Sequence, residues 1–137
     1  MALARTEAVS RSVTIALRFE DQSDGTAFAV YVDGNHNGVR TADIDARVDQ
    51  PIDAVVRLWQ LFPGVSIGVT PESGETEAVQ VGASRILSFT PAGTATPGTI
   101  YIRGRDGSQL AVRVLGATGR TRVLRLDRRR RVWIDAV

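Results

Sequence analysis

The spacing of hydrophobic residues changes near residue 12. Residues 2–11 are good helix formers with no Gly or Pro, and Leu3, Ala4 and Ala8 fall on one face of a helix. Between Val13 and Phe19, apolar residues alternate with small or polar ones, which is typical of a half-buried strand. The pattern therefore predicts a helix that leads directly into a β-domain.

The rest of the chain consists of short apolar runs separated by turn residues. We expect strands at residues 26–32, 47–52, 65–69, 85–90, 99–103, 110–115, 121–126 and 132–134. Residues 54–62 fit a strand or a helix, and their β-branched residues before Pro63 and Gly64 favour a strand. The expected fold class is α+β, with an N-terminal helix packed on a mostly antiparallel β-meander or sandwich. We expect one domain over residues 1–137, with the helix at 1–11 and the β-domain at 12–137.

Candidate catalytic groups are few. The chain has no cysteine, and its single histidine, His36, has no serine or acid in a recognisable catalytic arrangement. Its glycines lie at turns between strands and do not form a phosphate-binding loop. We therefore expect a protein without enzymatic activity and without a cofactor, a calcium ion being the one exception considered below.

Charge is distributed unevenly along the sequence. Residues 20–77 carry an excess of acidic residues, and residues 103–137 carry an excess of arginines. Such segregation indicates an oriented protein with one acidic and one basic region, if the fold does not mix the charges in space. The sequence is compatible both with two separate charged regions and with a fold that mixes the charges.

The segment from Asp33 to Asp45 is the first candidate site. Asp33, Asn35 and Asn37 alternate and Gly38 follows, which is how an EF-hand calcium loop begins. The twelfth position is Ile44 where such a loop has glutamate, although the flanking Asp43 or Asp45 could substitute. The site would consist of Asp33, Asn35, Asn37 and Asp43. The favoured alternative is a polar loop whose Asn and Asp side chains bond their own backbone.

The arginine-rich C-terminal region is the second candidate site. Because strand side chains alternate, Arg120 and Arg122 should lie on one side of the strand and Arg125 on the other. Guanidinium groups suit phosphate, so these residues and Arg128 could follow a nucleic-acid backbone. Alternatively, the arginines keep a strand edge solvated, and residues 128–131 form a tail or contact lipid headgroups.

Three blocks of this sequence, in order, resemble the soluble part of a minor pseudopilin of the GspH/FimT family. They are Ala4–Leu17, Ala29–Asp45 and Ile86–Val123, whereas Asp53–Ala83 matches only in its rhythm of strands and loops. The family comprises minor pseudopilins of type II secretion and minor pilins of type IV pili. The resemblance implies a structural subunit that takes part in assembly, initiation or the tip of such a filament, with other minor pseudopilins or pilins as partners.

The resemblance also implies a location and an alternative partner. Family members are anchored in the bacterial inner membrane by an apolar helix, with this domain in the periplasm. The sequence lacks that helix, so we expect residues 2–11 to be the end of a longer one. Some minor pilins bind DNA during natural transformation through a Gly-Arg-x-Arg motif. Here the motif would be Gly119, Arg120 and Arg122, assisted by Arg125 and Arg128.

Overall fold

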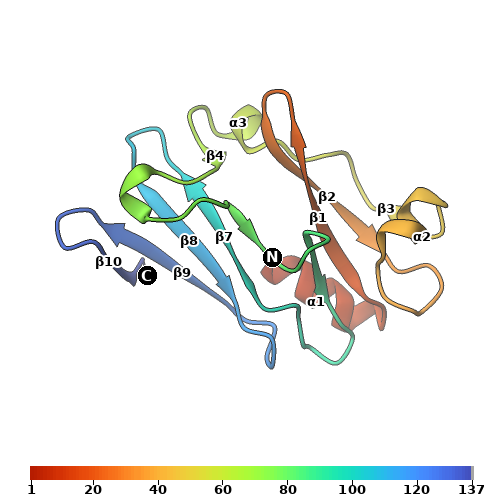
Figure 1. Ribbon diagram of the computed structural model, residues 1–137. Coiled ribbons are helices and arrows are strands. Elements are labelled where there is room, and N and C mark those ends of the chain that lie inside the picture. The colour runs from red at the N-terminus through yellow and green to blue at the C-terminus, as the bar shows by residue number, and fades with distance from the viewer. Residues whose placement is uncertain (137) are drawn as a thin grey trace.

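The computed structural model describes residues 1–136, in which one N-terminal helix leads into an antiparallel sheet of ten strands (Figure 1). The helical elements are α1 (Ala2–Arg11), α2 (Thr41–Asp45), α3 (Leu58–Leu61) and the 3₁₀ helix η1 (Pro71–Ser73). The strands are β1 (Ile15–Gln22), β2 (Gly25–Val32), β3 (Gln50–Pro51), β4 (Ser66–Ile67), β5 (Val79–Gln80), β6 (Ile86–Phe89), β7 (Gly98–Arg103), β8 (Gln109–Val114), β9 (Thr121–Asp127) and β10 (Val132–Asp135). The predicted α+β class and N-terminal helix are confirmed.

The sheet has two halves that diverge from each other. Its order is β10-β9-β8-β7-β4-β2-β1-β6, with β3 beside β2 and β5 beside β7. Figure 1 shows β7–β10 on one side and β1, β2 and β6 on the other, with α1 between them at one end. The main core fills the space between the halves, with Ala8 of α1, Ile15 and Leu17 of β1, and Ile100 of β7 all buried.

The helix α1 ends where the sequence pattern changes. Ser12 has a left-handed backbone (φ 54°), and its N–H donates to the carbonyl oxygen of Val9. This residue closes the last helical turn and redirects the chain, so that β1 begins at Ile15. The alternation from Val13 to Phe19 then places Ile15, Leu17 and Phe19 in the main core.

The predicted strand at residues 54–62 is wrong. The segment makes a single bridge, between Val56 and Phe28, and then forms the one-turn helix α3. One edge of β2 is shared by β3, by Val56 and by β4, so no free edge is long enough for a longer strand. Leu58 packs against the main core, whereas Leu61 and Phe62 are 62% and 58% exposed.

The other differences also concern short elements. The strand expected at 47–52 is reduced to Gln50–Pro51, and the short elements α2, η1 and β5 had no clear signal in the sequence. The segment containing α2 covers the outer face of the half formed by β1, β2 and β6, where Val39 and Ile44 pack with Ala16 and Ile86. It thereby lets both faces of β1 carry buried side chains.

The outer face of the half formed by β7–β10 is covered by the segment that follows β4. Val69 and Trp133 pack on Tyr101, Ala111 and Leu124. The fully buried amide of Gln109 holds this segment, because its Nε2 donates to the carbonyl oxygen of Gly68 (3.1 Å) and its Oε1 accepts from the N–H of Thr70 (2.6 Å).

Burial predicts how two leucines differ in their contribution to stability. Leu87 is fully buried in the main core and Leu61 is 62% exposed. We expect Leu87→Ala to lower the free energy of unfolding by about 2–5 kcal/mol, because it leaves a cavity. The same change at Leu61 should cost less than about 0.5 kcal/mol. Urea denaturation of both variants checks this, and equal losses would contradict the burial of β6.

Candidate functional site

The two candidate sites lie far apart in the fold. Figure 1 shows the segment around α2, which contains the Asp/Asn residues, at one end of the sheet and the β9–β10 hairpin at the other. They therefore have to be considered as separate sites.

Two buried carboxylates close the loop between Asp33 and Asp49. Asp33 accepts hydrogen bonds from the N–H groups of Asn35 (3.3 Å) and Gly38 (2.8 Å). Asp49, which the sequence analysis missed, accepts from the N–H groups of Gly34 (2.8 Å) and Arg40 (3.1 Å) and is 1% exposed. The loop thus has the self-bonded geometry of the favoured alternative.

The residues of the proposed calcium site differ in exposure and in hydrogen bonding. Asn35 and Asn37 are exposed, and Asp43 has one buried carboxylate oxygen without a hydrogen-bond partner. Within residues 1–136, no three acidic or histidine side chains come together as metal ligands would. Calcium binding at Asp33, Asn35, Asn37 and Asp43 stays a prediction, which a rise in Tm on adding CaCl2 would support.

The loop depends on Asp49 for its shape. We expect Asp49→Ala to lower the free energy of unfolding by about 2–4 kcal/mol, because two N–H groups lose their acceptor. The matched control is Asp45→Ala, at an exposed position of α2, which should change stability by less than about 0.5 kcal/mol. Urea denaturation measures both, and a neutral Asp49→Ala variant would show that the loop does not need this carboxylate.

Gly119 of the Gly-Arg-x-Arg motif lies where three segments meet. It has φ 65°, and a Cβ atom there would lie 2.6 Å from the carbonyl oxygen of Gly93. The Arg5 side chain of α1 lies against the same position, and its Nε donates to the carbonyl oxygen of Thr118 (2.9 Å). This packing accounts for the glycine without any ligand.

The two arginines of the motif are exposed and share the outer face of the sheet with a third. Arg122 donates through Nε to Asp135 (2.8 Å), and this bond lowers the pKa of the Asp135 carboxyl. Each side chain of the pair is 56% exposed, so the pair stabilises the fold little. Arg113 of β8 lies directly opposite Arg122, and Arg120 precedes Arg122 by two residues. We call Arg113, Arg120 and Arg122 the outer arginine cluster.

Arg125 and Arg128 do not belong to this cluster. Arg125 is in register with Leu110 and Ile134, so it lies on the opposite, inner face, as the alternation predicts. Arg128 is in the β9–β10 hairpin, near Gly107 of the β7–β8 turn. Arg113 was missed because its place opposite Arg122 depends on the register of β8 and β9.

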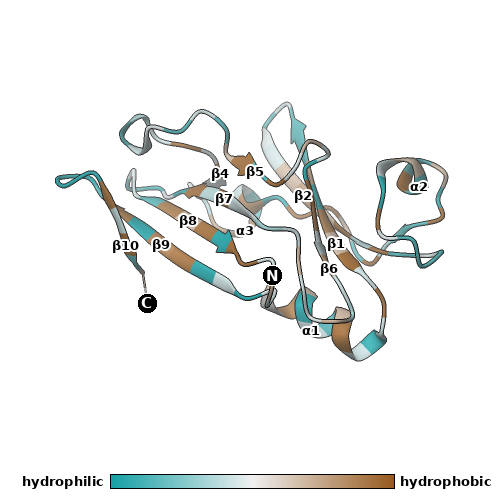
Figure 2. Ribbon diagram, turned by 60° about the horizontal axis from the view of Figure 1, so that its bottom comes forward, coloured by the Kyte–Doolittle hydropathy of each residue, from teal (hydrophilic) through white to brown (hydrophobic). Residues whose placement is uncertain are grey.

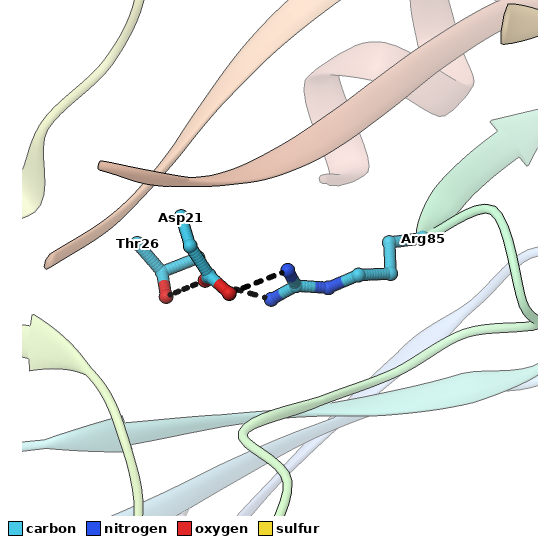
Figure 3. A network of polar contacts seen from close by, with 3 residues as sticks. All are labelled: Asp21, Thr26 and Arg85. Carbon is cyan, nitrogen blue, oxygen red and sulfur yellow. Dashed lines mark hydrogen bonds and ion pairs between the residues drawn. The ribbon is translucent and has the colours of Figure 1, made fainter.

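Several acidic side chains form hydrogen bonds or ion pairs with other residues of the same chain. Asp33 and Asp49 are buried, and Glu20 pairs with Arg18. Asp21 accepts from Arg85 (3.2 Å) and from the hydroxyl of Thr26 (2.8 Å), and these bonds lower the pKa of its carboxyl (Figure 3).

The arginine-rich end keeps most of its charge on the surface. Among residues 103–136, the ion pairs are those of Arg122 with Asp135 and of Arg130 with Asp127. Arg120, Arg125 and Arg128–Arg131 are all exposed. The segregation seen in the sequence therefore persists chiefly as a basic surface around β9 and β10.

An open apolar groove of about 630 Å³ lies between the halves of the sheet, beside α1. Figure 2 shows α1 at one end of these two halves. We call this space the inner groove; its walls include Met1, Ala4 of α1, Phe28 and Val30 of β2, Leu58 of α3, Ile102 of β7, and Val112 of β8. These side chains offer apolar contacts and no catalytic chemistry.

Comparison with known proteins gives one family. The family model described as Type II transport protein GspH matches residues 1–119. The chain belongs to the GspH family. GspH is a structural pseudopilin family, and membership supports a pseudopilin role in type II secretion and interaction with other pseudopilus components.

The matched region takes in α1 and the strands up to β8, and β9 and β10 lie beyond it. The searches of curated proteins and of solved structures gave no match. None of the helices within residues 1–136 has both the length and the apolar character that crossing a membrane requires.

Proposed function

We propose that this protein is a minor pseudopilin that takes part in the assembly, initiation or tip of a type II secretion pseudopilus. The observation that carries the proposal is the GspH family match over residues 1–119. The fold supports this proposal, because the matched region consists of a helix that packs on an antiparallel sheet through apolar side chains. In this proposal the domain lies in the periplasm and is held at the inner membrane by a helical segment preceding α1.

The surface supports protein–protein contact as the mode of action. The basic surface around β9 and β10 has few internal ion pairs, so it can attract and orient an acidic neighbouring subunit. A type IV pilus would use the same kind of contact, and the phenotype of a deletion strain distinguishes the two machines.

Deletion of the gene from its source bacterium should abolish export of type II substrates and leave pilus-dependent motility intact. The full-length gene should restore export, because the subunit is needed to assemble the filament. The Arg40→Ala/Arg47→Ala gene should restore it equally, since both side chains are exposed and lie beside α2, away from the basic surface. The measurement is the activity, in the culture medium, of enzymes that the type II system exports. Normal export in the deletion strain would contradict the proposal.

A second candidate function is binding of DNA during natural transformation. The observation that favours it is the outer arginine cluster, which brings Arg113 to the two arginines of the motif on one exposed face. Three guanidinium groups on adjacent strands suit the phosphates of a nucleic-acid backbone without reading its bases.

Titration with duplex DNA at several salt concentrations tests this candidate. For an Arg113→Ala/Arg120→Ala/Arg122→Ala variant, the log–log salt slope should flatten by about 0.9 for each lost phosphate contact. The control is Arg40→Ala/Arg47→Ala, which removes two exposed arginines near α2 and should bind as the wild type does. Absence of wild-type binding even at about 50 mM salt would refute DNA binding.

A further inference from the structure

The apolar surface of the inner groove continues beyond the groove itself. Ile102 is paired with Leu110, Leu110 with Arg125, and Arg125 with Ile134. Because directly paired residues place their side chains on the same face, these four residues form one row across β7, β8, β9 and β10. We call them the inner row. It runs from the groove wall at Ile102 to the edge of the sheet.

The far end of this surface is not covered by the rest of the described chain, whereas Ile102 and Leu110 are half-buried. α1 packs against β1 and β6, at the other side of the groove. Ile134 is 37% exposed and its neighbour Val132 is 45% exposed, whereas the outer face of the same strands is covered by Val69 and Trp133. A strip of apolar residues with one arginine that leads into an apolar groove is typical of a protein-binding surface.

The walls of the groove restrict the backbone of whatever binds there. β7 is paired with β8 along one edge and with β4 and β5 along the other, and β2 is paired with β1 along one edge and with β3 and β4 along the other. The walls therefore present side chains and few free backbone groups. An occupant must satisfy its own N–H and C=O groups, and a helix does so.

The charged side chains around this surface determine which residues a bound helix should carry. Arg125 stands in the inner row between Leu110 and Ile134, and Arg128–Arg131 lie beyond it in the β9–β10 hairpin. Elsewhere on the groove wall, Glu7 and Arg11 form an ion pair with each other (2.7 Å), and Asp53 is exposed. The side chains over β9 and β10 thus favour acidic residues in the occupant.

We infer that the inner groove and the inner row receive an amphipathic helix from another pseudopilus subunit, with acidic side chains placed against Arg125. The inference rests on the proposed function for the source of the helix. Its apolar face packs on Ile102 and Val112, and its polar face stays exposed at the groove mouth. The concave shape of the groove suits a helix better than the flat surface of a lipid bilayer.

A model peptide tests the inference directly. The probe is a helical peptide about 16 residues long with Leu and Ala on one face and Glu along the border of that face, within reach of Arg125. Two control peptides have the same composition in scrambled order, or Gln in place of Glu. Binding to the wild-type protein is measured by fluorescence anisotropy, and its position by NMR shifts of the Ile102, Val112 and Ile134 methyl groups.

The variant Arg125→Glu should weaken binding about tenfold or more, because it places like charges together. The matched control is Arg120→Glu, an exposed charge reversal on the outer face, which should bind as the wild type does. The scrambled peptide should not bind. The Gln peptide should bind more weakly than the Glu peptide, with less dependence on salt.

Several results would overturn the inference. They are the absence of binding, binding without shifts at the three methyl groups, equal binding of the scrambled peptide, or preferential binding of anionic phosphatidylglycerol vesicles. Co-purification of the full-length wild type with other pseudopilus subunits is a separate experiment that tests the proposed function. If the wild type co-purifies and the peptide does not bind, the groove inference alone fails. If co-purification fails as well, the proposed function fails with it.

Discussion

The geometry of the molecule depends on the two-residue strand β4, which joins the halves of the sheet. Ile67 pairs with Thr26 of β2 and with Ile102 of β7, and the order of the sheet has β4 as the link between those strands. The chain just beyond it is fixed by the buried amide of Gln109, whose four hydrogen bonds replace those it would make to water. Ile67 of this joint also lines the inner groove. A buried polar group thus holds the chain next to an apolar surface.

The charged residues are divided between two tasks. Carboxylates at Asp33 and Asp49 satisfy backbone N–H groups inside one loop, and Asp21 ties the β1–β2 hairpin to Arg85 next to β6. Most arginines of the C-terminal strands remain at the surface and are free to act on a partner. The two faces of β9 differ in what they offer, because the outer face groups arginines whereas the inner face places one arginine among apolar side chains. A single strand can therefore serve two different contacts.

The longer elements of this fold follow from local patterns, and the shorter ones do not. The helical spacing of residues 2–11 and the alternation after Val13 predicted α1 and β1, because each pattern is repeated over several residues. The two-residue strands β3, β4 and β5 form where a neighbouring edge is free, which only the tertiary structure decides. The same holds for the site. Arg120 and Arg122 were visible in the sequence, but the place of Arg113 depends on strand register and the need for Gly119 on contacts with Gly93 and Arg5.

The contact of Arg5 with Thr118 has a mechanical consequence. The helix α1 is joined covalently to β1 at its C-terminal end, and Arg5, near its other end, holds the β8–β9 turn. A force pulling on the helix along its axis is therefore divided between two separate parts of the sheet. The packing of Ala4 and Ala8 on the main core shares this load with the Arg5 contact and with the junction at Ser12. This side chain therefore makes the helix and the β8–β9 turn move together when the helix is pulled.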